Sequence, residues 1–148
     1  MHDAGYLNLC DKVFEKIYVP KLVYDEIKQS GISPLIAQVE GFIRSGFFIV
    51  KGCGNTALVN SLRSFLGPGE AETIALAIEL EGAEVVILDE SKARNLYKRL
   101  GPTKRLIGTI GILKFMVVHG LIKESPDKVV TKLEQAGFRF KKDLFKDC

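Results

Sequence analysis

The sequence predicts a single α/β domain in which helices cover both faces of a parallel sheet. Its 148 residues are the usual length of one domain, and 47% of them are apolar, enough for a hydrophobic core. Short apolar runs alternate along the chain with longer segments of helical period, which is typical of strands and helices in turn. This alternation favours a parallel sheet over an all-helical or all-β fold.

The predicted strands are short apolar runs that lack polar alternation. Phe47 to Val50 and Val85 to Leu88 are continuously apolar, which indicates strands covered on both faces. Weaker runs of the same kind predict two shorter strands and a late edge strand. The expected strands therefore span 17–19, 47–50, 85–88, 106–107 and 138–140.

The predicted helices follow from apolar periodicity and from start signals such as Ser33-Pro34 and Ser125-Pro126. The segment 56–66 places Phe65 on its inner stripe, and Gly67-Pro68-Gly69 then breaks the helix. The next helix is apolar through Ile74 to Ile78, so it should be central and buried. The expected helices span 6–15, 20–29, 33–45, 56–66, 70–81, 91–100, 109–119 and 125–137.

Composition excludes several classes of protein. Lys and Arg (21) exceed Asp and Glu (18) by three, a mild basic excess that is compatible with nucleic acid. The cysteines (Cys10, Cys53, Cys148) form no CxxC pair, which excludes a disulfide scaffold and a zinc ribbon. Cys10 should lie in the core and the other two should be exposed. The most apolar stretch is too short for a membrane span, and the default expectation is a cytoplasmic protein.

Acidic side chains fall where parallel strands deliver functional groups, at the carboxyl ends of the sheet. Asp89 directly follows the strand 85–88, Glu70 opens the buried helix with Glu72 two residues on, and Glu26 lies two turns into an early helix. Each has a structural alternative. Glu70 can favour a helix dipole, Asp89 can cap a helix, and Glu26 can belong to a solvated face.

Carboxylates that lie together at one end of a sheet repel each other, and a bound divalent cation usually offsets this repulsion. Oxygen donors without nearby His or Cys favour Mg²⁺ or Mn²⁺ over zinc. Such a site suits phosphodiester hydrolysis. The candidate catalytic residues are Glu26, Glu70 and Asp89, and Glu72 would bind the metal or orient a water.

A basic cluster follows Asp89. Lys92, Arg94 and Lys98, with further basic residues up to 105, would contact phosphates as positioning rather than sequence-reading groups. An ordinary solvated helix face explains the same pattern equally well.

Several of these segments together resemble the PIN-like proteins, in particular an uncharacterised prokaryotic branch related to VapC-like nucleases. The resemblance covers nearly the whole chain in order. It is carried by YVP at 18–20, VYDEI at 23–27, LGPGEAETIALA at 66–77, DESKAR at 89–94, GTIGIL at 108–113 and AGFR at 136–139.

The resemblance implies a three-layer α/β nuclease fold and Mg²⁺- or Mn²⁺-dependent cleavage of single-stranded RNA. It makes Glu26 the acid of the early helix, Glu70 (with Glu72 as a close alternative) the acid opening the buried helix, and Asp89 the acid after the later strand. VapC-like members are toxins neutralised by an antitoxin, which implies an antitoxin-like protein partner.

The sequence departs from the family pattern at its start. The family begins with a central strand ending in Asp, whereas the segment 5–7 resembles the helix that follows it and Asp3 is the only nearby acid. We therefore expect one PIN-like domain over 1–148 that is truncated at its N-terminus and lacks the first central strand. Either the natural chain starts further upstream or the activity is impaired, and the second reading is favoured. A homodimer would cover the exposed faces. The alternative function is a catalytically inactive interaction or dimerisation module. A nucleotide binder is disfavoured because the phosphate-binding glycines are missing.

Overall fold

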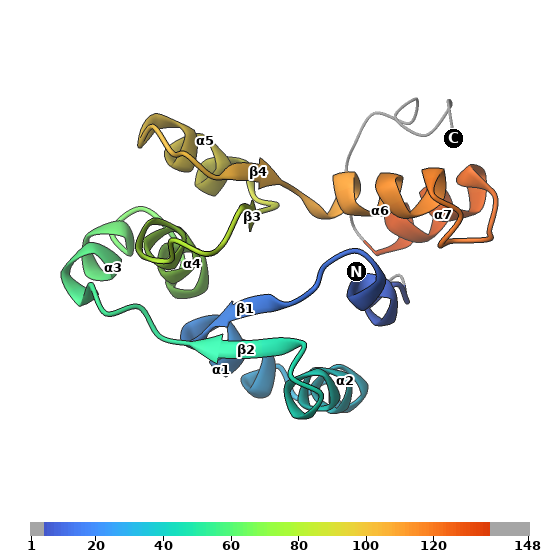
Figure 1. Cartoon of the computed structure of the whole chain (residues 1–148), viewed down its shortest axis with the longest axis horizontal. Helices are drawn as coiled ribbons and strands as arrows, with labels where there is room; N and C mark the ends of the chain where they lie inside the picture. The colour runs from blue at the N-terminus through green and yellow to red at the C-terminus, as the bar shows by residue number, and fades with distance from the viewer. Residues whose placement is uncertain (1–4, 137–148) are drawn as a thin grey trace. The chain divides into compact units, whose positions relative to one another are not determined.

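The computed structural model describes residues 5–136 and divides the chain into two compact units (Figure 1). The larger unit is Lys16–Gly108, and the smaller combines Met1–Glu15 with Thr109–Cys148. The predicted strand 138–140 lies outside the described residues.

The larger unit alternates strands and helices, as its sequence pattern predicts. In chain order it contains β1 (Ile17–Pro20), α1 (Lys21–Gln29), α2 (Ser33–Arg44), β2 (Phe48–Lys51), α3 (Thr56–Leu62), α4 (Pro68–Glu79), β3 (Val85–Ile87), α5 (Ser91–Arg99) and β4 (Arg105–Ile107). The predicted boundaries hold to within a few residues because prolines and glycines mark most of them.

The strands pair in parallel, which confirms the predicted α/β class. β1 pairs with β2, with Ile17 opposite Phe48, and β3 pairs with β4, with Val85 opposite Arg105. Within the described residues these pairs form two separate two-stranded sheets rather than one continuous sheet.

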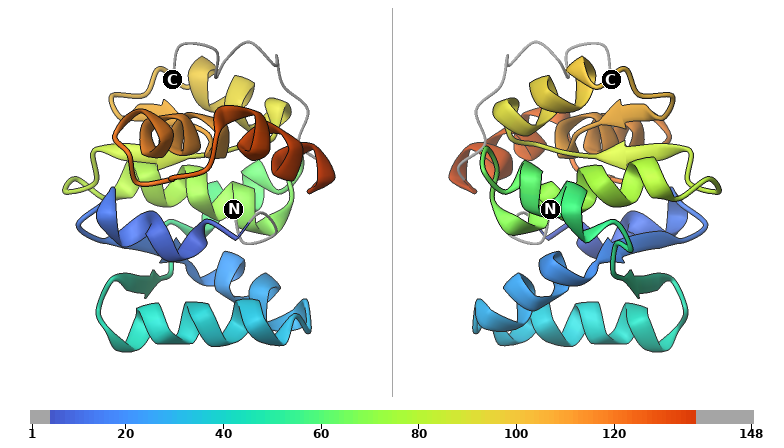
Figure 2. Two further views of the ribbon diagram at one scale, coloured as in Figure 1. Left: turned by 90° about the vertical axis from the view of Figure 1, so that its right-hand side faces the viewer. Right: turned by 90° about the vertical axis from the view of Figure 1, so that its left-hand side faces the viewer.

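Helix α4 is the centre of the larger unit and contacts both sheets (Figures 1 and 2). Pro68 occupies its first turn, where a missing N–H costs nothing. Ala71, Ile74 and Ala75 are buried with at most 1% of their surface exposed, so the prediction of a buried helix holds for this face. Ile78 is 51% exposed, however, because the last turn of α4 carries it away from the core.

Two other expectations about the core were wrong. Helix α3 ends at Leu62 and continues as a turn, so Phe65 leaves the predicted inner stripe and is 61% exposed. Cys53 is buried rather than exposed. The predicted burial of Cys10 is confirmed.

The smaller unit contains η1 (Leu7–Lys12), α6 (Thr109–Val118) and α7 (Pro126–Gln135). The predicted helix 6–15 is a shorter 3₁₀ helix, since its backbone makes i to i+3 bonds such as Val13 N–H to the Cys10 carbonyl. Tyr6 donates a hydrogen bond of 3.0 Å to Glu124, which also forms a 2.8 Å ion pair with Lys132. Between residues 5 and 136 no helix is long and apolar enough to cross a membrane.

Candidate functional site

Glu70 lies in the first turn of α4 and is half-buried. Burial, hydrogen bonding with the Glu90 carboxyl group and repulsion from Glu90 raise the pKa of Glu70, and the charge of Glu26 adds to this effect. A hydrogen bond with the Gly67 backbone acts in the opposite direction. This bond matches the backward-reaching Glu of a capping box, three residues into a helix. Three carboxyl groups therefore influence one another at the start of α4.

Glu90 is the residue that the sequence analysis missed. It follows Asp89 and stands at the N-cap position of α5, but within the described residues its side chain makes no capping hydrogen bond to that helix. The carboxyl group instead meets Glu70. Its place three residues beyond the end of β3 is the sequence signal that could have found it.

Glu26 reaches the same turn from α1. Its Oε1 atom accepts a 3.0 Å hydrogen bond from the backbone N–H of Gly69, one of the donors that a helix start leaves without an internal partner. Both Glu26 oxygens lie only 2.9 Å from the position that a Cβ atom on Gly69 would take. The close approach of Glu26 to α4 thus depends on glycine at position 69.

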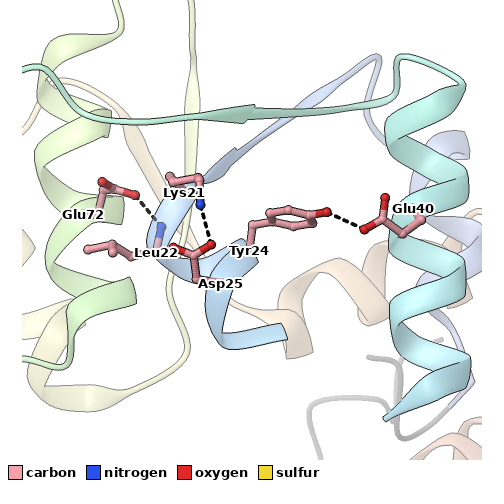
Figure 3. A network of polar contacts seen from close by, with 6 residues as sticks. All are labelled: Lys21, Leu22, Tyr24, Asp25, Glu40 and Glu72. Atoms are coloured by element: carbon pink, nitrogen blue, oxygen red, sulfur yellow. Dashed lines mark hydrogen bonds and ion pairs between the residues drawn. The ribbon is translucent and has the colours of Figure 1, made fainter. Parts of the chain in front are cut away.

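The side chain of Glu72, on α4, points toward the first turn of α1 (Figure 3). Its side chain is buried, with 6% of the residue exposed, and its Oε1 atom accepts a 2.8 Å hydrogen bond from the backbone N–H of Leu22. On the opposite side of α1, the Tyr24 hydroxyl donates to Glu40 of α2, which raises the pKa of Tyr24. Helix α1 is therefore held by a carboxylate on each side.

Asp89 is exposed two residues after the end of β3 and lies beside Gly108. Its Oδ1 atom is 3.1 Å from the position of a Cβ on Gly108, and the Arg94 Nη1 atom is 3.0 Å from the same point. Arg94 also donates a 2.7 Å hydrogen bond to the Leu88 carbonyl, which fixes the guanidinium where β3 ends. A positive group therefore lies in the surroundings of Asp89.

The predicted acids thus fall into three settings. Glu70 and Glu90 are in contact at the start of α4, and Glu26 bonds the backbone of the same turn; Glu72 lies against α1, and Asp89 lies beside Gly108. In the described part of the chain no three acidic, His or Cys side chains are close enough together to form a metal-binding group.

The contact between Glu70 and Glu90 nevertheless fits a hard divalent ion in its donor chemistry. Two carboxyl groups in contact repel unless a proton or a cation lies between them. Mg²⁺ commonly uses one or two protein carboxylates and keeps several waters. The residues present are therefore compatible with Mg²⁺ or Mn²⁺.

The basic candidates all lie on α5, which follows the acids directly. Lys92 and Lys98 are exposed, whereas Arg94 is half-buried and engaged with the Leu88 carbonyl. Lys92 and Lys98 are therefore accessible to a nucleic acid in solution. Arg94 also stabilises the end of β3 through its hydrogen bond to Leu88.

A family model described as a PIN domain matches residues 1–148. No curated protein and no solved structure matches the chain. The family match covers the full sequence and agrees with the mixed helices and parallel strand pairs of the structure. The chain belongs to the PIN domain family, whose fold is of the nuclease type.

Proposed function

We propose that this protein is a divalent-metal-dependent nuclease that hydrolyses phosphodiester bonds of single-stranded RNA. The observation that carries the proposal is the contact of the Glu70 and Glu90 carboxyl groups, with Glu26 held beside them at the start of α4. PIN domains generally use divalent metals, and this group supplies the oxygen donors that such ions prefer.

The acidic residues of this site would bind the metal, and the basic residues of α5 would bind the RNA. Glu70 and Glu90 would hold Mg²⁺ or Mn²⁺ directly, with Glu26 beside them at the start of α4. Asp89 would join them by turning from its place beside Gly108. The bound ion would supply a water of lowered pKa and neutralise charge on the phosphate. Lys92 and Lys98 would contact backbone phosphates, and Arg94 would do so from its place beside the Leu88 carbonyl.

The test is cleavage of a fluorescently labelled single-stranded RNA with Mn²⁺ or Mg²⁺ and with EDTA. We expect trimming in the presence of the metal that is lost in Glu70→Gln and in Asp89→Asn. Glu81→Gln is the matched control, because Glu81 is an exposed acid just beyond the other end of α4. Undiminished cleavage in both Glu70→Gln and Asp89→Asn would overturn the assignment.

A second candidate is a non-catalytic interaction module that self-associates as a homodimer or binds an antitoxin-like protein. It is favoured by the structural use of two predicted acids, since Glu26 and Glu72 each accept a backbone hydrogen bond from a neighbouring helix. It predicts no cleavage with any metal, a dimer in analytical ultracentrifugation and a melting temperature that Mg²⁺ does not change.

A further inference from the structure

Two hydrogen bonds join α1 and α4 reciprocally. Glu72 of α4 accepts from Leu22 N–H at 2.8 Å, and Glu26 of α1 accepts from Gly69 N–H at 3.0 Å. Leu22 and Glu26 are four residues apart on α1, and Gly69 and Glu72 are three apart on α4, so both bonds lie on the facing sides of the two helices. Along α1 the residue number rises from Leu22 to Glu26, whereas that of the bonded residue on α4 falls from Glu72 to Gly69. The two helices therefore run in opposite directions across this contact.

This arrangement links a buried carboxylate to an exposed one. Glu72 is 6% exposed and holds the first turn of α1, whereas Glu26 is exposed one turn further along the same helix. A shift of the first turn of α1 would carry Glu26 with it, because a helix moves as a rigid segment over one turn. Glu26 would then leave Gly69 N–H and its place beside Glu70.

We propose that Glu72 is a positioning residue: it anchors α1 so that Glu26 stays beside Glu70, and it acts on the metal through Glu26 rather than as a ligand. This inference rests on the proposed metal-dependent function of the same site. It assigns Glu72 a role that depends on its hydrogen-bond acceptor and not on its charge.

Two substitutions distinguish the hydrogen-bond acceptor of Glu72 from its charge. In Glu72→Gln the amide oxygen can still accept from Leu22 N–H, whereas Glu72→Ala removes the acceptor. With Mn²⁺ alone as the probe, titrated by calorimetry, we expect Glu72→Gln to bind within about twofold of the wild type. We expect Glu72→Ala to bind about tenfold more weakly or worse, the usual cost of losing a group that orients a ligand.

Glu79 supplies the matched control on the same helix. It is also a carboxylate that accepts backbone hydrogen bonds, from Gly54 and Asn55 at 3.0–3.2 Å, but it lies at the opposite end of α4. Glu79→Ala should lower the urea midpoint without weakening Mn²⁺ binding. If it weakens binding as much as Glu72→Ala does, the effect is general loosening and the positioning role is wrong.

Equal losses of Mn²⁺ affinity in Glu72→Gln and Glu72→Ala would make Glu72 a ligand and overturn the proposal. Undiminished binding in Glu72→Ala would overturn it too. If Glu72→Ala fails to fold, Glu72→Gln decides alone, since a ligand role predicts a large loss and a positioning role predicts almost none.

Failure of the proposed function gives a different result. A wild-type protein that neither binds Mn²⁺ nor cleaves RNA would end the metal assignment and with it any effect of Glu72 on the metal. The amide proton resonance of Gly69 reports the position of Glu26 independently. It should move upfield in Glu72→Ala and stay in place in Glu72→Gln, and an unmoved resonance in both variants would refute the coupling itself.

Discussion

Glu26 on α1 and Glu72 on α4 each accept a hydrogen bond from the backbone of the helix that carries the other. Both acceptors meet a helix start, where backbone N–H groups lack internal partners and the helix dipole favours negative charge. Neither helix obtains this acceptor from its own N-cap residue, since Pro20 and Gly67 have no polar side chain. Each helix therefore depends on the other for the stability of its first turn.

Gly69→Ala should disturb this pair directly. A Cβ at position 69 would lie 2.9 Å from both Glu26 carboxylate oxygens and 3.0 Å from Cγ2 of Val23, so α1 must move or Glu26 must turn away. We expect a loss of about 1–3 kcal/mol in the free energy of unfolding, the usual cost of overpacking, measured by urea denaturation.

Gly111→Ala is the control for this substitution, because Gly111 is also in a helix but a Cβ there meets no atom within 4 Å. It should stabilise the protein by about 0.5–1 kcal/mol, since alanine loses less entropy than glycine in a helix. A Gly69→Ala variant that is as stable as the wild type would show that Glu26 does not approach α4 as described.

Most of the fold could be predicted from the sequence because its signals are local. Apolar runs and turn residues located the four described strands, and parallel pairing followed from the alternation with helices. Phe65 and Ile78 were misplaced because a helix that ends early, or turns away from the core in its last turn, keeps the same apolar period.

The candidate site could be predicted only in part. Glu26 and Glu70 were placed at one end of the sheet by position alone, and both do lie at the start of α4, where the charge of Glu26 raises the pKa of Glu70. The turn of Glu72 toward Leu22 is a relation between helices 50 residues apart in sequence, and no local pattern encodes it. Glu90 was missed because an N-cap residue is expected to bond its own helix, whereas this one meets Glu70.

The basic residues of α5 should separate into two kinds on substitution. Arg94→Ala removes a half-buried donor to the Leu88 carbonyl, so we expect a loss of about 1–3 kcal/mol of unfolding free energy. Lys92→Ala and Lys98→Ala should change stability by less than about 0.5 kcal/mol, because both side chains are exposed.

The two lysines should instead affect RNA binding. Each phosphate contact with single-stranded nucleic acid contributes about 0.7 to the slope of log affinity against log salt, so each variant should lower that slope by about this amount. Fluorescence anisotropy of a labelled RNA, titrated at several salt concentrations, measures it. Lys16→Ala is the control, since Lys16 is exposed and precedes β1 at the amino end of its sheet. Equal slopes in all four proteins would remove α5 from the RNA interface.

Cys10 should make the protein less stable in alkali. Burial raises the pKa of its thiol from an ordinary value of 9.0 to about 11, and nearby Asp11 adds to this. Between these two values the unfolded chain has released the proton and the folded chain still holds it. The unfolded state therefore binds fewer protons, and the free energy of unfolding falls as the pH rises from about 9 toward 11. Below about pH 9 the thiol is protonated in both states and has no such effect.

Urea unfolding of the wild type and Cys10→Ala at several pH values between 8 and 11 isolates this contribution, because the tyrosines titrate in both proteins. The variant should be less stable at pH 8, since removing the buried sulfur leaves a cavity. The difference in the free energy of unfolding between the two proteins should become smaller toward pH 11.

Alkylation of the native protein followed by mass spectrometry gives an independent measure of the burial of Cys10. At pH 9 Cys10 should react more slowly than it does in urea, because only the thiolate attacks and burial suppresses both its formation and its access. A constant stability gap from pH 8 to 11, with equally fast alkylation in the folded and unfolded protein, would show that Cys10 is open to solvent.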